Sequence, residues 1–238
     1  MMKIALVSTF INAAPVLASW LERHRQLGIS QFYLFTDTPA ETGRYAAHTA
    51  PDILWTPRDD ALISRWQALP SWDEYAPYCE GEWYARQCLN ADLAFNQAKA
   101  DGCDWLIHLD IDEELYAPGA RSLAETLVAH AGNDLLHFAN HEAIPEAWHI
   151  DDYFRDVTLF KKHHEVLTEP QRLLAMKHFG TSITSPMAMA RRQPTCMAQP
   201  DARRAHTGSS PAFRRRARAI SACCIFPIAA STGFTRSF

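Results

Sequence analysis

Four carboxylates stand within five residues of one another, directly after the short apolar run of residues 105–109. They are Asp110, Asp112, Glu113 and Glu114. The apolar run has the length and composition of a buried parallel strand, and side chains two apart on an extended segment point the same way. We therefore expect Asp110 and Asp112 to converge on one point, where a hard cation such as Mg²⁺ or Mn²⁺ would offset their repulsion. The alternative is a polar strand end whose acids cap the next helix.

The segments that must position these acids alternate between strand and helix. Strands are expected over residues 4–9, 31–36, 53–55, 105–109 and 135–139. Helices are expected from Pro15 to Gly28, over residues 82–100, and from a capping box at Ser122 and Glu125 to Gly132. Residues 56–81, with three prolines, are expected to form an irregular connection. This alternation predicts an α/β fold with a mostly parallel sheet flanked by helices, which binds ligands at the carboxyl ends of its strands.

Length and composition favour a globular domain. The chain has 238 residues, 47% of them apolar, and no apolar run reaches the ~18 to 20 residues of a membrane span. No signal-peptide pattern opens the sequence, so we expect a cytoplasmic protein, with a peripheral contact at the inner face of the membrane left open. The six cysteines form no C-x-x-C pair, which argues against a zinc or redox motif and favours buried free thiols.

The charge distribution divides the chain into two parts. Residues 1–190 carry 14 Lys and Arg against 26 Asp and Glu, whereas residues 191–238 carry nine Arg against one acid. The second part lacks helical or strand periodicity. One interpretation is a basic arm for an anionic lipid or nucleic acid. The other is a shifted reading frame, because Met187-Ala188-Met189-Ala190 becomes an alternation with Gly when it is read one base earlier.

The order and spacing of several motifs over about 100 residues resemble the family 2-like glycosyltransferases, in the branch related to glycosyltransferase family 92. The residues that carry the resemblance are Trp20, Leu21, His24, Leu27, Gly28, Asp37, Arg86, Gln87, Asn90, Ala94, Asp104, Trp105, Asp110, Asp112 and Glu113. Such proteins have a GT-A fold, a Rossmann-like domain. The resemblance covers roughly residues 3–185 and implies a GT-A domain over residues 1–190. Members carry a Gly-Asn-Gly-Lys-like stretch near residue 187, so we expect the domain to be C-terminally incomplete and residues 191–238 to be frameshifted or disordered.

The resemblance also implies a nucleotide-sugar site. Asp110 and Asp112 would hold Mn²⁺ or Mg²⁺ on the donor diphosphate, and Arg86 would contact a phosphate. Asp37 would accept from the ribose or base. Arg86 as a helix salt bridge and Asp37 as a turn cap are the alternatives. The family's Lys-Asn-Glu loop after the first strand is replaced here, and only Asn12 is shared.

An acceptor hydroxyl, on a glycan or a lipid-linked glycan, needs a catalytic base if the reaction inverts the anomeric centre. Glu142, after the last expected strand, is the candidate, with Glu113 and Asp151 as alternatives. Four histidines are equally consistent with surface positions and with metal ligation: His141, His149, His163 and His164.

Two other functions fit part of the sequence. The run from Leu109 to Leu115 is similar to the nucleophile motif of haloacid-dehalogenase-type phosphatases, although that motif usually opens a chain and has Thr or Val where Glu114 stands. A non-catalytic binding protein, with structural acids and a basic tail, is the second. The preferred prediction is a metal-dependent glycosyltransferase, and no nucleic-acid partner is expected.

Overall fold

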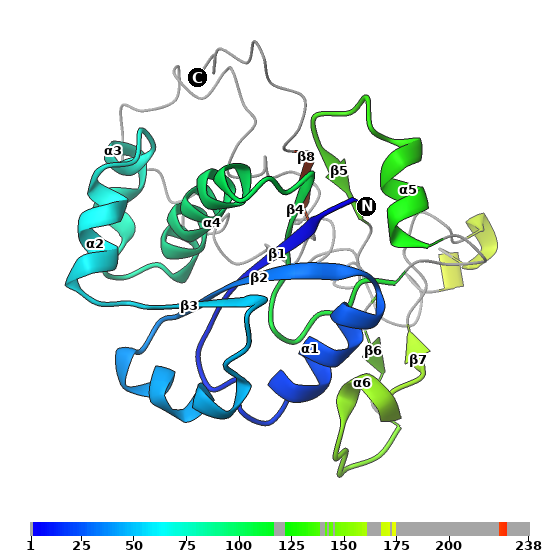
Figure 1. Cartoon of the computed structure of the whole chain (residues 1–238). Coiled ribbons are helices and arrows are strands. Elements are labelled where there is room, and N and C mark those ends of the chain that lie inside the picture. Colours follow the sequence, from blue (N-terminus) through cyan, green and yellow to red (C-terminus); the bar gives the residue numbers. More distant parts are fainter. Residues whose placement is uncertain are drawn as a thin grey trace.

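The fold is known from a computed structural model (Figure 1). The structure describes residues 2–116, 122–138, 141, 143–144, 146–160, 168–171, 173–174 and, for the backbone alone, 224–227. Within these residues, no helix has both the length and the apolar content needed to cross a membrane.

A twisted parallel sheet forms the centre of the domain. Its four parallel strands lie in the order β3 (Ile53–Pro57), β2 (Ile29–Thr36), β1 (Ile4–Phe10) and β4 (Trp105–His108). Beyond β4, the sheet continues with β8 (Cys224–Pro227), antiparallel to β4, and β5 (Leu136–His137). A separate antiparallel pair joins β6 (Ala143–Ile144) to β7 (Leu159–Phe160). The predicted α/β fold with a mostly parallel sheet is confirmed.

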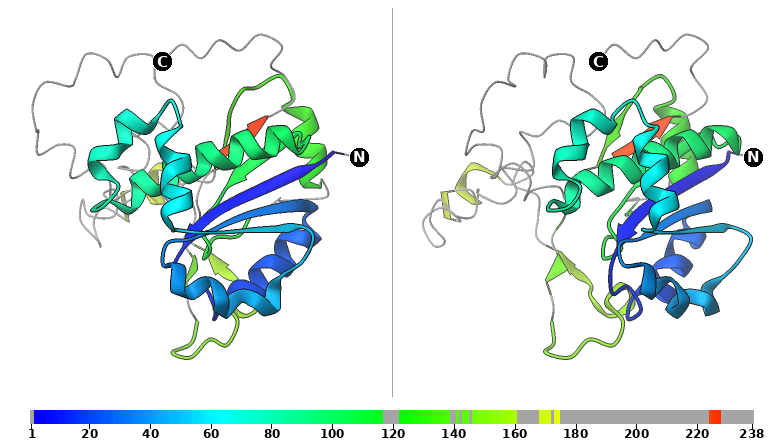
Figure 2. Two further views of the ribbon diagram at one scale, coloured as in Figure 1. Left: turned by 60° about the vertical axis from the view of Figure 1, so that its left-hand side comes forward. Right: turned by 90° about the vertical axis from the view of Figure 1, so that its left-hand side faces the viewer.

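Helices cover both faces of the sheet (Figure 2). One face packs against α1 (Leu17–Gln26), the 3₁₀ segment η1 (Pro39–His48) and α5 (Leu123–Ala129). The other packs against α2 (Asp60–Gln67), α3 (Trp72–Tyr75) and the long α4 (Trp83–Ala100), with the 3₁₀ turn η2 (Ala76–Tyr78) between α3 and α4. Every residue of β1 and β4 is buried, and most of their side chains are apolar, as expected for central parallel strands; Ser8, Thr9 and His108 near their carboxyl ends are polar.

The sequence signals at the ends of α1 and α5 act as expected. Gly28, just past the end of α1, has a φ of +97°, a conformation that glycine adopts without strain. The capping box of α5 is formed in both directions, since the Ser122 hydroxyl accepts from the Glu125 N–H and the Glu125 carboxylate accepts from the Ser122 N–H.

The expectation of an irregular connection over residues 56–81 is wrong. This segment contains α2, α3 and η2, and its prolines lie at element ends: Pro57 ends β3, Pro70 separates α2 from α3, and Pro77 lies in η2. The Asp59 carboxylate caps α2 by accepting from the Leu62 N–H at 2.9 Å.

The tail is described only as the β8 backbone, which lies beside β4 although its sequence shows no strand period. Residues 187–190 and the rest of 191–238 lie outside the described residues, so the frameshift hypothesis stays a prediction. Among the cysteines, Cys79 and Cys103 are buried and free as expected, whereas Cys88 is disulfide-bonded, against the expectation of free thiols.

Candidate active site at the carboxyl ends of the parallel strands

The strand order creates a topological switch point between β1 and β4. The chain passes from β1 to β2 to β3 in one direction across the sheet, and β4 lies on the other side of β1. Open parallel sheets bind ligands beyond the carboxyl ends of their strands at such a point. Asn12 follows β1, Asp37 follows β2, and the acidic loop, defined here as residues 110–116, follows β4. The fold therefore gathers the predicted donor-site residues at one edge of the sheet.

The acidic loop is a turn rather than an extended segment. β4 ends at His108, and the Asp110 carbonyl then accepts from the Glu113 N–H at 3.1 Å. In return, the Asp110 N–H donates to Glu113 Oε2 at 3.2 Å. The expectation that Asp110 and Asp112 align along a strand is wrong, because this reciprocal pair closes a turn between them. Asp112 is exposed in that turn, and its charge still acts on Asp110.

Asp110 is the most strongly perturbed carboxyl group of this edge. Burial, together with the charges of Glu113 and Asp112, raises its pKa to about 7. A hydrogen bond from Gln87 Nε2 to Oδ1, 2.8 Å long, opposes these effects by stabilising the ionised form. A carboxyl group whose proton is held by neighbouring negative charge gains from a cation at the same place.

Helix α1 contacts the acidic loop from one side. The Trp20 indole Nε1 donates to the Glu113 carbonyl at 2.9 Å, and the Leu115 N–H donates to His24 Nε2 at 3.4 Å. Nearer the surface, the Arg23 guanidinium binds Glu114 Oε1 through Nε and Nη2, at 3.0 and 2.7 Å. Three residues of one helix thus hold the second half of the loop.

Helix α4 contacts the strand ends from the other side. Arg86 forms a two-pronged ion pair with Asp37, at 2.7 Å from Nε and 2.9 Å from Nη2, while Nη1 donates to the Cys79 carbonyl at 2.7 Å. Asn90 donates to the Thr9 hydroxyl at the end of β1, at 3.0 Å. Together with Gln87 on Asp110, these side chains bind the ends of β2, β4 and β1. Arg86 and Asp37 were predicted separately as ligand contacts, and the structure pairs them with each other.

The loop after β1 is held through its backbone. Asn12 has a φ of 55°, its N–H donates to the buried Glu41 carboxylate at 2.9 Å, and its own side chain is exposed. The next N–H, of Ala13, donates to the Tyr45 hydroxyl at 3.0 Å. The Asn12 side chain is therefore exposed at this edge of the sheet, while Glu41 and Tyr45 fix its backbone.

His108 lies in β4, two residues before Asp110, and is buried. Burial lowers its pKa to about 4, so it is neutral near pH 7. Within the described part of the chain, no group hydrogen-bonds its Nε2 atom. His108 therefore adds no positive charge beside the acidic loop.

The proposed base cannot be placed, since Glu142 lies outside the described residues, as do His163 and His164. Asp151 and His149 are described; Asp151 is exposed just before α6 (Tyr153–Asp156), and His149 is exposed too. The geometry gives Asp151 and His149 neither a contact with the acidic loop nor a catalytic role.

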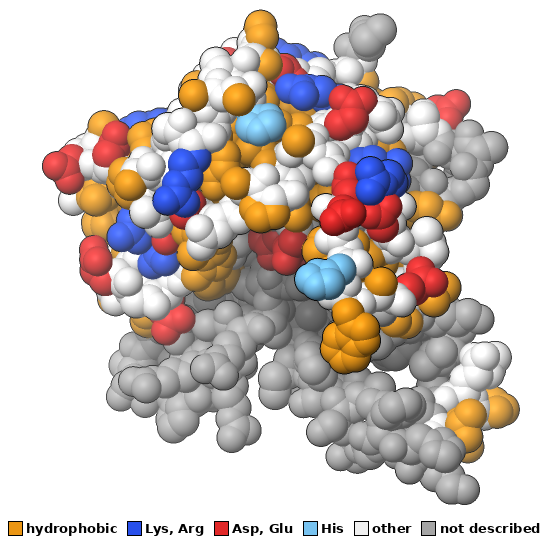
Figure 3. Space-filling view, turned by 90° about the horizontal axis from the view of Figure 1, so that it is seen from below, with side chains coloured by type: hydrophobic (Ala, Val, Ile, Leu, Met, Phe, Trp, Pro, Cys, Tyr) orange, Lys and Arg blue, Asp and Glu red, His pale blue; other side chains and the backbone are white. Residues whose placement is uncertain are grey.

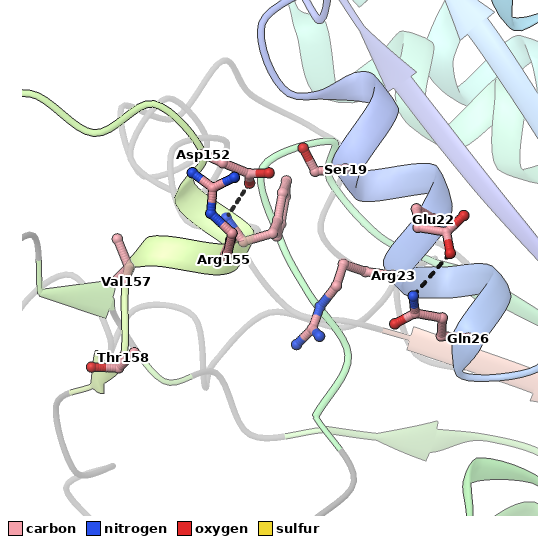
Figure 4. A pocket seen from close by; sticks show the side chains of 9 residues that line it. Ser19, Glu22, Arg23, Gln26, Asp152, Arg155, Val157 and Thr158 are labelled. Carbon is pink, nitrogen blue, oxygen red and sulfur yellow. Dashed lines mark hydrogen bonds between the residues drawn. The ribbon is translucent and has the colours of Figure 1, made fainter.

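An open cavity of about 420 Å³ lies between α1 and α6 (Figure 4). Arg23 lines it and also binds Glu114, so the cavity borders the acidic loop through one side chain. The surrounding face mixes hydrophobic, acidic and basic groups (Figure 3). Between residues 143 and 160, the large exposed hydrophobic residues are Ile144, Trp148, Tyr153, Leu159 and Phe160.

Sequence reasoning assigned no role to Gln87 or Glu41. Gln87 could have been found, because Arg86, Gln87 and Asn90 form a polar stripe on a helix that is otherwise apolar toward the sheet. Glu41 gave no comparable signal, since its partner N–H is 29 residues away in the sequence.

The carboxylate oxygens at this site are suitable ligands for a divalent cation. Asp110 and Asp112 supply two carboxylates, and Mg²⁺ commonly takes one or two protein carboxylates and fills its other positions with water and phosphate oxygens. Among the described residues, no cluster of three or more His, Cys, Asp or Glu side chains forms an all-protein metal site. A cation held here would therefore depend on a bound diphosphate for part of its coordination.

Comparison with known proteins finds similarity to glycosyltransferase-like proteins. No family model matches the chain. It is 31% identical over 160 residues to each of two proteins of Arabidopsis thaliana, the glycosyltransferase-like proteins At3g57200 and At2g41451. The matches cover 62% of this chain but 31% and 35% of those proteins, so the chain spans about a third of the length of the curated relatives it matches. The similarity is distant and is to glycosyltransferase-like proteins.

Proposed function

We propose that this chain carries the donor-binding part of a metal-dependent glycosyltransferase, which moves a sugar from a nucleotide-sugar to a hydroxyl acceptor. The observation that carries the proposal is the Asp110 carboxyl group, whose pKa is raised to about 7 beside Asp112 and Glu113 at the switch point of the sheet. The similarity to glycosyltransferase-like proteins supports the same reaction class.

Asp110 and Asp112 would hold Mn²⁺ or Mg²⁺ against the donor diphosphate. The cation, when bound, supplies Lewis-acid stabilisation of the negative charge that develops on the leaving nucleoside diphosphate. Gln87 favours the ionised, metal-binding form of Asp110 through its hydrogen bond. The protein's task at this edge is to hold two carboxyl groups in place, so that a bound cation can stabilise their ionised form.

The ion pair of Arg86 with Asp37 changes the roles proposed for these two residues. Arg86 donates from Nε and Nη2 to the Asp37 carboxylate and from Nη1 to the Cys79 carbonyl. We therefore propose that Arg86 orients Asp37, which accepts from the ribose or base, rather than meeting a phosphate directly. Asn12, exposed on the loop after β1, is proposed to contact the nucleotide from the other side.

Glu142 stays the proposed catalytic base for a glycan or lipid-linked acceptor. Its replacement by Gln should lower kcat about 10²-fold with unchanged donor affinity, because proton transfer by a positioned base contributes ~10² to 10⁴ in rate. Unchanged turnover would assign the base elsewhere.

Thermal unfolding with Mn²⁺ and a nucleoside diphosphate tests the proposed function. A ligand present at about 100 times its Kd stabilises the folded state by ~2.7 kcal/mol, which raises Tm by about 5 to 10 °C for a domain of this size. The double variant Asp110→Asn, Asp112→Asn should fold and lose the shift. The matched control Asp73→Asn, Asp134→Asn removes two exposed carboxylates and should keep it.

The outcomes separate this function from the alternatives. A full shift in the Asp110, Asp112 variant removes these residues from the site. No shift in wild type with any of the common nucleoside diphosphates, together with phosphate release from an aryl phosphate, would favour the phosphatase interpretation instead.

A further inference from the structure

We propose that His24 is a positioning residue for the divalent cation: it fixes the acidic loop from helix α1 and so sets where Asp112 lies. The inference rests on the proposed function, since it assumes that Asp110 and Asp112 share a cation. It assigns to α1 a task in metal binding although no α1 side chain would touch the metal.

The hydrogen bonds of His24 define one neutral form of its ring. Nδ1 lies 2.8 Å from the Trp20 carbonyl, which can only accept, so Nδ1 carries the hydrogen. Nε2 lies 3.4 Å from the Leu115 N–H, which can only donate, so Nε2 accepts. The ring therefore relays a contact from the backbone of α1 to the backbone of the acidic loop.

Trp20 strengthens this contact from the same helix face. The Trp20 and His24 rings lie 4.6 Å apart between centroids, and both side chains are fully buried. While His24 accepts from Leu115, the Trp20 Nε1 atom donates to the Glu113 carbonyl at 2.9 Å. The loop backbone is thus held at two alternate residues by two rigid rings in the core, and buried rings move little in a close-packed interior.

Asp112 depends on these backbone contacts because its own side chain is exposed. On its N-terminal side, Asp110 is fixed by Gln87 and by the end of β4. On its C-terminal side, Glu113 and Leu115 are fixed by Trp20 and His24. These two sets of contacts fix the loop backbone on both sides of Asp112. A cation that Asp110 and Asp112 both coordinate should therefore bind less tightly when either set is lost.

A role in core packing alone is the competing explanation, and two variants separate the two. His24→Leu fills a similar volume but cannot accept from Leu115. His24→Gln carries a carbonyl oxygen that can take the place of Nε2 as the acceptor. If only packing matters, the polar Gln is the more harmful change; if positioning matters, Gln rescues what Leu loses.

The experiment measures Mn²⁺ binding by the full chain with electron paramagnetic resonance of free Mn²⁺, beside Tm for each variant. His24→Leu should weaken Mn²⁺ binding about 10- to 100-fold, as outer-shell changes commonly do, and His24→Gln should stay within about threefold of wild type. His130→Leu, which removes an exposed histidine away from the loop, serves as the matched control and should bind as wild type does.

Each outcome either supports or overturns the positioning role of His24. Wild-type Mn²⁺ affinity in folded His24→Leu, or an equal loss in the Leu and Gln variants, overturns the positioning role. If His24→Leu does not fold, Trp20→Phe replaces it. Trp20→Phe keeps an aromatic ring in the core but removes the donor to Glu113, so it should also weaken Mn²⁺ binding. Wild-type affinity in that variant overturns the inference. Wild-type protein that binds no Mn²⁺, either alone or together with a nucleoside diphosphate, overturns the proposed function itself.

Discussion

Helices α1 and α4 hold the same edge of the sheet in different ways. From α1, Trp20 and His24 bind backbone groups of the acidic loop. From α4, Arg86 and Gln87 bind the carboxylates of Asp37 and Asp110 themselves. One helix therefore holds the backbone of the acidic loop, and the other holds the carboxyl groups of Asp110 in that loop and of Asp37 after β2. A site built in this way separates geometry from charge, and changes on the two helices should have different signatures.

The largest effect is expected on the α4 side, at the ion pair of Arg86 with Asp37. Both side chains are only about a tenth exposed, at 10% and 11%. Arg86→Met leaves the Asp37 carboxylate with only a marginal contact to Arg58 at 3.5 Å, so the free energy of unfolding should fall by about 3 to 5 kcal/mol. Urea unfolding measures the change. Arg58→Met, which removes the more exposed partner, should cost less than about 1 kcal/mol, and equal losses in the two variants would contradict this assignment.

The next effect concerns pH, in metal-free protein. The folded pKa of Asp110 is about 7, above its ordinary value of 3.8, so the unfolded chain releases this proton first as pH rises. Asp110 therefore lowers the free energy of unfolding between about pH 4 and pH 7, by roughly 3 kcal/mol after allowance for its partial exposure. Asp110→Asn should abolish this loss, and its stability should rise relative to wild type across that window.

His24 and His108 also make stability depend on pH, so the effect of Asp110 is measured as the difference in unfolding free energy between wild type and Asp110→Asn. Burial lowers the pKa of both His24 and His108 to about 4, so each contributes stability above its unfolded pKa that is lost as pH falls toward 4. This trend opposes that of Asp110 in the same window. Because both histidines are present in wild type and in Asp110→Asn, their contributions cancel in the difference between the two curves. A difference that is flat from pH 4 to 7 would show that Asp110 titrates normally.

Replacing Gln87 should affect the pH dependence of Mn²⁺ binding, whereas replacing His24 should not. Gln87→Leu removes the hydrogen bond that favours ionised Asp110, so Mn²⁺ binding should weaken about 10-fold or more and its pH midpoint should move upward. The His24→Leu variant should weaken binding without moving that midpoint. Gln97→Leu, on the exposed side of the same helix, is the control. Identical pH midpoints in the Gln87 and His24 variants would erase the distinction between the two helices.

The smallest effect is expected at Arg23, the α1 side chain that binds a carboxylate of the acidic loop, that of Glu114. Its side chain is 47% exposed, and solvent screens exposed ion pairs. Arg23→Gln should change the free energy of unfolding by less than about 1 kcal/mol, and less still in high salt. A loss above 2 kcal/mol in chemical denaturation would mean that Glu114 contributes more to the loop than its exposure allows.

Much of the fold follows from local signals, and the site only partly. The strands, the end of α1 at Gly28 and the capping box at Ser122 are encoded in residues close together in the sequence, and each is found as expected. The helices between residues 56 and 81 were missed because the prolines suggested breaks throughout. The better signal was Asp59 before an apolar pattern at Leu62 and Trp66, which predicts a capped helix.

The contacts that build the site depend on distances in three dimensions. Asp37 and Arg86 are 49 residues apart, and Trp20 and Glu113 are 93 apart. Sequence pattern predicted Asp37 at the end of a strand and Arg86 on a helix, but it could not show that these two side chains bind each other. The turn within the acidic loop was missed for a related reason, since it is closed by Glu113 bonding back to Asp110 rather than by a turn-specific residue.

The most direct test of the account is a crystal of the chain soaked with Mn²⁺ and a nucleoside diphosphate, measured at the manganese absorption edge. The account predicts one anomalous peak within coordination distance of both the Asp110 and the Asp112 carboxylates, with Gln87 still bound to Asp110 and His24 to the Leu115 N–H. A peak bonded to neither carboxylate, or diphosphate bound at this edge with no metal beside them, would contradict it.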